Sequence, residues 1–237
     1  MLPPPPPVQD GPVLVSPLAS AIELLGFVAF SYGLRELADD LDAPLLVRAL
    51  GLPVVEVVVV WALLRLRGLP LRAVGFSWRG WRSRDFATTL ASVAAVLGIY
   101  LLVRPLVAAL VGEDLDLSAF DRIRGDTTLL ILGLVQAVVI AGFREELLYR
   151  GFLMTRIAGT VQSSRAPWAV ALVAQALVFG IAHAYQGPTG MIVSGAAGLV
   201  FGILMLASGK RLLPAMIAHA GVDAIALVAI YSGIPLV

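Results

Sequence analysis

The sequence contains no cysteine and few charged residues. Without cysteine, the chain has no disulfide bond, no thiolate metal ligand and no cysteine nucleophile. Only 14% of its 237 residues are charged, whereas soluble domains have roughly 25%. Hydrophobic residues make up 59% of the chain, and the mean hydropathy is +0.92. This composition predicts a polytopic integral membrane protein.

Two further absences narrow the class of protein. The formal net charge is only +1, and no basic patch is interleaved with aromatic residues, so a nucleic-acid partner is not expected. The start, MLPPPPPVQDG, lacks a positive segment and a small-residue cleavage site, so we do not interpret it as a signal peptide. Residues 1–11 are predicted to be a disordered, proline-rich tail, and residues 12–237 a single transmembrane helical domain.

Apolar runs long enough to cross a bilayer, about 20 residues each, set the predicted fold. The fold class is all-α, a polytopic membrane bundle with seven transmembrane helices, or eight if Arg65–Asp85 forms a helix of its own. A polar link of Arg35, Glu36, Asp39, Asp40 and Asp42 is expected between the first two runs, and a kink at Pro53. The runs are approximately Pro12–Gly33, Leu45–Leu64, Phe86–Val111, Thr127–Ile157, Pro167–Ala184, Gly190–Ala207 and Leu212–Tyr231.

The distribution of charge predicts the orientation of the bundle. The basic stretch Arg65–Asp85, which also contains Trp78 and Trp81, is typical of a cytoplasmic membrane interface. The loop 112–126 is rich in acids and is expected on the other side. A further basic group supports a cytoplasmic end for the fourth helix; it consists of Arg144, Arg150, Arg156 and Arg165.

The stretch Ala141–Phe152, AGFREELLYRGF, places ionisable groups inside an apolar helix. Such groups cost roughly 2.5–3.5 kcal/mol at bilayer depth, so they indicate a functional site. Glu146 and Arg150 are four residues apart and are predicted to pair on one helical face. Glu145 lies about 100° further round the helix and remains available for chemistry.

The only two histidines, His183 and His219, also fall inside apolar runs. Phe179 precedes His183 by four residues and is expected to stack on the same face, as a wall of the substrate pocket. Asp223 follows His219 by four residues and can accept from its imidazole. Glu145 and His183 are about equally far from an expected turn near residues 163–164, so antiparallel helices bring them to one depth.

A carboxylate, two imidazoles and an aspartate in an apolar bundle indicate a site that activates water. In one version zinc is bound by His183, His219 and Glu145, and it lowers the pKa of its water to about 7. In the other version no metal is needed. Glu145 is then the general base for a water held with His183, while His219 and Asp223 stabilise the oxyanion. Both versions predict hydrolysis of an amide bond.

The three motifs, Glu145-Glu146-x-x-x-Arg150, Phe179-x-x-x-His183 and His219-x-x-x-Asp223, resemble the signature of the CPBP family. That family contains type II CAAX prenyl endopeptidases and bacterial proteins linked to bacteriocin processing and self-immunity. The resemblance covers about 127–231, the expected catalytic half. It implies an intramembrane protease, either a zinc enzyme or a glutamate enzyme. Prenyl endopeptidases typically carry Asn at the position of Asp223.

The resemblance also implies the setting: a bacterial cell membrane, a peptide or protein substrate at the bilayer, and an active site facing the cytoplasm. Two alternatives stay open. One is a non-proteolytic family member that acts in bacteriocin self-immunity or as a membrane scaffold. The other is a proton-coupled transporter, although no internal repeat is found. Three intramembrane charges have no assigned role: Glu23, Glu56 and Arg104, of which the last two are a candidate pair.

Overall fold

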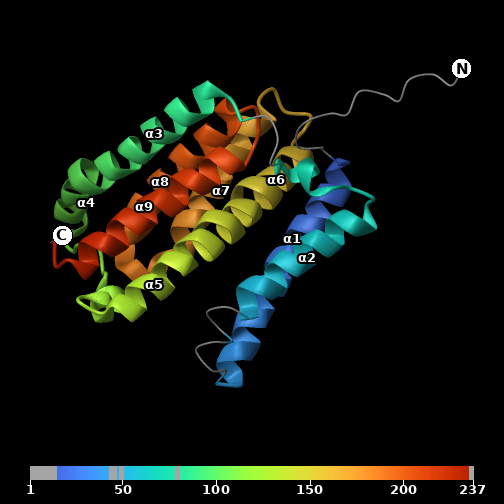
Figure 1. Cartoon of the computed structure of the whole chain (residues 1–237). Helices are drawn as coiled ribbons and strands as arrows, with labels where there is room; N and C mark the ends of the chain where they lie inside the picture. Colours follow the sequence, from blue (N-terminus) through green and yellow to red (C-terminus); the bar gives the residue numbers. More distant parts are fainter. Residues whose placement is uncertain (1–14, 43–46, 48–50, 78–80, 235–237) are drawn as a thin grey trace, which may run out of the picture.

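The computed structural model describes residues 15–42, 47, 51–77 and 81–234 (Figure 1). These residues form an all-helical bundle, which confirms the predicted fold class. Seven long helices are present in this part of the chain, as the apolar runs predict. Their bounds are α1 Pro17–Asp40, α2 Leu52–Leu66, α3–α4 Ser83–Val111, α5–α6 Thr127–Thr160, α7 Pro167–Ala182, α8 Gly187–Ala207 and α9 Leu213–Tyr231.

Two of these helices contain wider, π-helical turns. The first joins α3 (Ser83–Gly98) to α4 (Arg104–Val111). The second, Ala137–Leu153, joins α5 (Thr127–Gln136) to α6 (Met154–Thr160). We refer to the continuous helix from Thr127 to Thr160 as the central rod. Wider turns of this kind often occur at functional sites, and this one carries the motif with the two glutamates.

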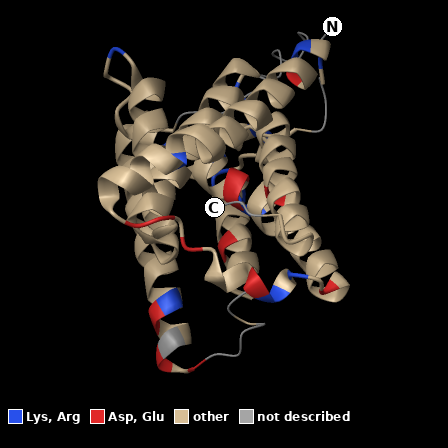
Figure 2. Cartoon of the chain, turned by 90° about the vertical axis from the view of Figure 1, so that its left-hand side faces the viewer, with Lys and Arg blue, Asp and Glu red and all other residues tan. Residues whose placement is uncertain are grey.

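Among the described residues, five helices are long and apolar enough to cross a membrane: Pro17–Ala38, Ser83–Val111, the central rod, Ala184–Ala207 and Leu213–Tyr231. The shorter α7 is also apolar. Figure 2 shows that charged residues lie mainly near helix ends, with a few inside the bundle. The chain is therefore a multi-pass integral membrane protein.

The bundle has two parts, which meet along the central rod (Figure 1). Helices α7, α8 and α9 pack together and against the rod, and α3 covers α8 and α9. On the other side, α1 and α2 form a hairpin; α1 contacts α6, and α2 contacts the π-helical part of the rod. The rings of Phe27 on α1 and Phe152 on the rod meet edge to face, with centroids 5.1 Å apart.

Some predicted boundaries were wrong or lie outside the described residues. Helix α1 continues to Asp40, so most of the expected polar link is helical. Pro53 lies in the first turn of α2, where no intrahelical N–H is required, and residues 43–46 and 48–50 are outside the described part. The proline-rich tail, Trp78 and Arg79 are also outside it. Within Arg65–Asp85, the structure shows a short 3₁₀ turn at Leu71–Val74.

A ridge of small residues on α8, which includes Gly198 and Gly202, brings α7 and α8 close together. A Cβ atom on Gly198 would lie 3.1 Å from the Phe179 ring, and one on Gly202 would lie 2.9 Å from Gln175 Nε2. Only glycine permits these approaches without displacing the neighbouring side chains. The ridge therefore fixes how far α7 stands from α8, and with it the position of Phe179.

Three arginines that were used to predict the orientation are internal. Arg144, Arg150 and Arg156 are buried, with 7%, 0% and 0% of their surface exposed. Each pairs with a glutamate of the bundle, so none counts as a loop charge in the positive-inside rule. These three arginines therefore do not support the predicted orientation of the bundle. The orientation depends instead on basic residues in loops.

Candidate active site

The central rod positions a fully buried ion pair. Arg150 Nη1 donates to Glu146 Oε1 across 2.9 Å, and neither side chain is exposed. The pair forms because residues four apart lie on one face of the helix. The predicted pairing of Glu146 with Arg150 is confirmed, and it neutralises both charges inside the bundle.

Glu145 faces a different direction from Glu146. Its side chain is 17% exposed, and its Oε2 lies 3.9 Å from Nε2 of His219. Its other oxygen lies 3.7 Å from Nη1 of Arg144. Both separations exceed a direct hydrogen bond, so neither oxygen of Glu145 is tightly bonded to these two groups. Of the two adjacent carboxylates, Glu145 is the one that is accessible.

Helix α9 brings His219 onto Glu146. Nδ1 of His219 lies 2.8 Å from Glu146 Oε1, and only 5% of the residue is exposed. Asp223, the partner expected from the sequence, lies 4.0 Å from Nε2, a looser contact on the other ring nitrogen. The rod and α9 can approach because residue 142 is glycine: a Cβ there would lie 2.9 Å from the carbonyl oxygen of Met216.

His183 follows the last residue of α7 and is half-buried. Its Nδ1 lies 2.8 Å from the carbonyl oxygen of Phe179. Since a carbonyl only accepts, Nδ1 carries the proton and Nε2 has a free lone pair. The rod ends at Thr160 and α7 begins at Pro167, so Glu145 and His183 lie at similar distances from the turn, as the spacing predicts.

The ring of Phe179 connects the two histidines and the buried arginine. Its centroid lies 4.5 Å from that of His183 and 5.8 Å from that of His219. The guanidinium of Arg150 lies over the same ring at 4.3 Å. The predicted contact of Phe179 with His183 is confirmed, but the two rings are tilted by 48° and not stacked. Because only 2% of Phe179 is exposed, it supports the imidazoles from behind; a role in substrate binding remains a prediction.

Gln175 on α7 bonds to α8 at this site, and the sequence did not predict this contact. Its Nε2 donates to the carbonyl oxygen of Gly198 at 3.0 Å, and Nη2 of Arg150 donates to the same oxygen at 3.3 Å. Gln175 is fully buried. Gln175 could have been identified in the sequence as an isolated side-chain amide in an apolar run. Such an amide requires a hydrogen-bond partner inside the bundle.

The three charges without an assigned role all have partners. Glu23 accepts from Arg156 Nε at 2.5 Å and from Arg67 Nε at 2.7 Å. Glu56 is bonded to Arg144, and a nitrogen of Arg35 lies 3.9 Å from its other oxygen.

Arg104 pairs with Asp114 at 3.5 Å. The candidate pairing of Glu56 with Arg104 was therefore wrong, because α2 packs on the central rod and Arg104 lies on the helix formed by α3 and α4.

The side chains proposed for zinc are not arranged as a ligand set. In the described part of the chain, no three His, Asp or Glu side chains are grouped so that they could hold a metal ion. Nδ1 of each histidine is bonded, to the carbonyl of Phe179 or to Glu146, so a metal could be bound only through Nε2. Zinc at this site stays a prediction.

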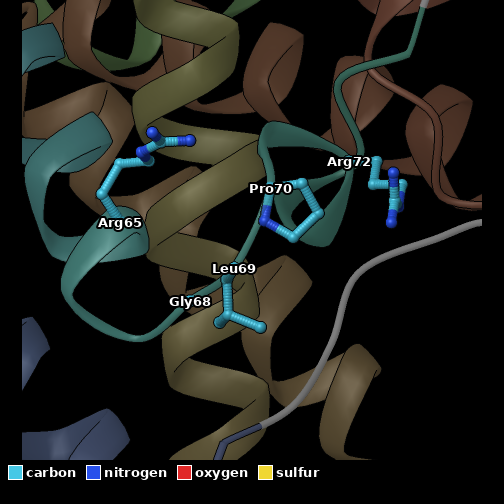
Figure 3. Close-up of a pocket in the computed structure, with 5 residues that line it drawn as sticks. All are labelled: Arg65, Gly68, Leu69, Pro70 and Arg72. Carbon is cyan, nitrogen blue, oxygen red and sulfur yellow. The ribbon is translucent and has the colours of Figure 1, made fainter.

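A separate hollow of about 280 Å³ lies at the end of α2 (Figure 3). It is lined by Arg65, Gly68, Leu69, Pro70 and Arg72. None of the candidate catalytic residues lines it.

Comparison with known proteins bears on the second half of the chain. Residues 127–225 match the family model described as type II CAAX prenyl endopeptidase Rce1-like. The match contains all three motifs. No curated protein and no solved structure matches the chain.

Proposed function

We propose that the chain is an intramembrane endopeptidase of the CPBP family, because residues 127–225 match the type II CAAX prenyl endopeptidase Rce1-like model. It would hydrolyse a peptide bond of a membrane-associated substrate. The observation that carries the proposal is the position of Glu145. This carboxylate is partly exposed, and its Oε2 lies 3.9 Å from Nε2 of the buried His219.

In the proposed reaction, Glu145 is the general base. A water in the gap donates one hydrogen to Glu145 and the other to the free Nε2 of His183. Glu145 takes up the proton as the water oxygen attacks the substrate carbonyl, and it then delivers this proton to the leaving amine. The hydrogen bond from Nδ1 of His183 to Phe179 supports this role because it fixes the required tautomer.

His219 is the proposed oxyanion donor. Its Nδ1–H is held by Glu146, which orients Nε2 towards the gap beside Glu145. With Nε2 also protonated, the imidazolium donates to the oxyanion. Asp223, 4.0 Å from Nε2, balances this charge, and its protonated form would itself be a donor. The bond from Arg150 keeps Glu146 fixed behind the histidine.

The proposed setting is a bacterial cell membrane, with the site open to the cytoplasm. Basic residues near two helix ends support this orientation, because exposed Arg65 lies in the last turn of α2, exposed Arg72 follows that helix, and Lys210 precedes α9. The proposed substrate is a peptide or protein anchored at the bilayer. The steps above use only the protein's own side chains.

Cleavage by the purified protein in liposomes tests the proposal. The probe is an internally quenched peptide anchored by a farnesyl group, with a palmitoylated version beside it. Glu145→Gln should lower kcat by about 10²–10⁴-fold, the usual contribution of a general base. His183→Gln should also lower kcat, because glutamine cannot replace the imidazole lone pair.

Two outcomes separate this proposal from its alternatives. Full cleavage by Glu145→Gln, or no cleavage of any anchored peptide together with an unchanged cellular phenotype of that variant, would favour a scaffold or self-immunity role. Metal analysis decides between the two chemistries. An active preparation without bound zinc supports the glutamate reaction, and zinc near one equivalent that is lost in His183→Ala supports the metal reaction.

A further inference from the structure

We propose that Glu56, on α2 and outside the family-matched residues, is a positioning residue for Glu145. Its role is to hold Arg144, the neighbour of Glu145 in sequence, so that this guanidinium does not form a full ion pair with the catalytic carboxylate. The inference depends on the proposed role of Glu145 as general base.

The contacts form a chain across the hairpin and the central rod. Nη2 of Arg144 is bonded to Oε2 of Glu56, while Nη1 of the same guanidinium lies 3.7 Å from Oε1 of Glu145. Glu56 and Arg144 are buried, with side chains 4% and 9% exposed. A nitrogen of Arg35 on α1 lies 3.9 Å from the other oxygen of Glu56. One guanidinium thus lies between two carboxylates, and the direct bond goes to Glu56.

Which of the two carboxylates this guanidinium bonds matters for catalysis. Arginine readily forms bidentate bonds to a carboxylate, and these occupy the oxygen lone pairs of the acceptor. A general base needs one of those lone pairs for the proton of the attacking water. If Glu56 were neutral, Arg144 would remain buried with Glu145 as its nearest anion. The guanidinium would then turn towards Glu145 and engage the oxygens that the reaction requires.

A second ion pair provides a natural comparison. Glu23 on α1 is bonded to Arg156 further along the rod, with exposed Arg67 as its second partner. Like the Glu56 pair, it joins a buried hairpin glutamate to a buried rod arginine, and an additional arginine approaches from the hairpin. Arg156 contacts no proposed catalytic residue in the described part of the chain. If the Glu56 pair only attached the hairpin to the rod, substitution of either glutamate should have the same effect.

The contact also explains why the hairpin would matter to a site built on other helices. Glu56 reaches the rod because α2 packs against its π-helical part. The hairpin thus contributes a charge close to the base, although the three motifs all lie beyond it. We expect cleavage to require the hairpin in its docked position.

The experiment compares Glu56→Gln, Glu56→Gln/Arg144→Gln and the control Glu23→Gln. Each is measured in liposomes with the farnesylated quenched peptide, and its thermal unfolding is recorded. Glu56→Gln should lower kcat by about tenfold or more, with KM within about twofold of wild type. The reason is that freeing the Arg144 guanidinium impairs Glu145 as general base, which acts in the chemical step. The double variant should recover kcat to within about threefold of wild type, because the misdirected guanidinium is gone. Glu23→Gln should lower Tm and leave kcat near wild type.

The recovery in the double variant separates positioning from simple stability, since two structural losses would add. Unchanged kcat in Glu56→Gln, or a double variant no more active than the single one, overturns the inference. If Glu56→Gln does not fold, Glu56→Asp decides, because it keeps the charge and should keep kcat within about threefold of wild type. A failure of the proposed function itself looks different, because Glu145→Gln would then remain active.

Discussion

The imidazole of His219 donates from Nδ1 to Glu146 Oε1 across 2.8 Å, and this same oxygen accepts from Arg150 at 2.9 Å. Glu146 therefore joins the histidine of α9 to the arginine of the central rod. The adjacent Glu145 takes no part in this bond and faces the accessible side of His219. Two neighbouring carboxylates thus have different environments, which leads to a direct test.

Glu146→Gln should destabilise the protein much more than Glu145→Gln. Loss of the Glu146 charge leaves Arg150 buried without a counter-ion, which costs about 3–5 kcal/mol in free energy of unfolding. Glu145 is partly exposed, so its substitution should cost only about 1 kcal/mol or less. Thermal unfolding in one detergent measures both. Equal losses of stability would show that the two glutamates do not have separate roles.

Gly142→Leu should separate the rod from α9. A side chain at this position meets Met216 and Ala220 of α9, at 2.9 and 3.0 Å for the Cβ atom alone. Overpacking of this kind costs about 1–3 kcal/mol, and it should also lower kcat because His219 moves away from Glu146. Gly221→Ala is the control, because a Cβ at Gly221 has no neighbour within 4 Å. If Gly142→Leu cleaves the peptide at the wild-type rate, the close approach is not needed for the site.

Phe179→Leu should weaken the support behind both histidines. The substitution removes the ring under Arg150 and the ring contacts to His183 and His219. The expected loss of stability is about 1–3 kcal/mol, together with a lower kcat. Phe86→Leu is a suitable comparison because 60% of that residue is exposed. Similar unfolding temperatures and rates for both variants would contradict the role given to Phe179.

Asp126 should stabilise the start of the central rod. Its Oδ1 accepts from the backbone N–H of Leu129 at 3.0 Å, as an N-cap. Asp126→Ala should cost about 1 kcal/mol, whereas Asp126→Asn should cost much less because asparagine caps equally well. Chemical denaturation gives the two differences. A loss in Asp126→Asn as large as that in Asp126→Ala would indicate that charge, rather than capping, is important there.

Much of the site could be predicted from spacing within single helices. Glu146 pairs with Arg150, and the ring of Phe179 contacts that of His183. In each pair the residues are four apart, so helix geometry alone brings them together. The same reasoning proposed His219 with Asp223, and these two side chains make only a loose contact, at 4.0 Å. Glu146, from another helix, is the closer acceptor because Gly142 lets α9 approach the rod.

Pairings across helices could not be predicted. Glu56 was a candidate partner of Arg104 and bonds Arg144 instead, while Glu23 bonds Arg156. A buried glutamate requires a cation, but the sequence contains several and does not specify which helix packs beside it. The same limit affected the orientation argument, because an arginine inside an ion pair and an arginine in a loop are identical in sequence.

The sequence by itself determined that this protein is an all-helical membrane bundle, where its helices lie and which side chains are candidates for catalysis. Those properties depend on apolar run length and on spacing within one helix, which are local. Only the tertiary structure decided that His219 belongs with Glu146 and Arg144 with Glu56, pairs separated by 73 and 88 positions in the chain. Such contacts depend on how closely helices pack, and close packing is a property of the assembled bundle.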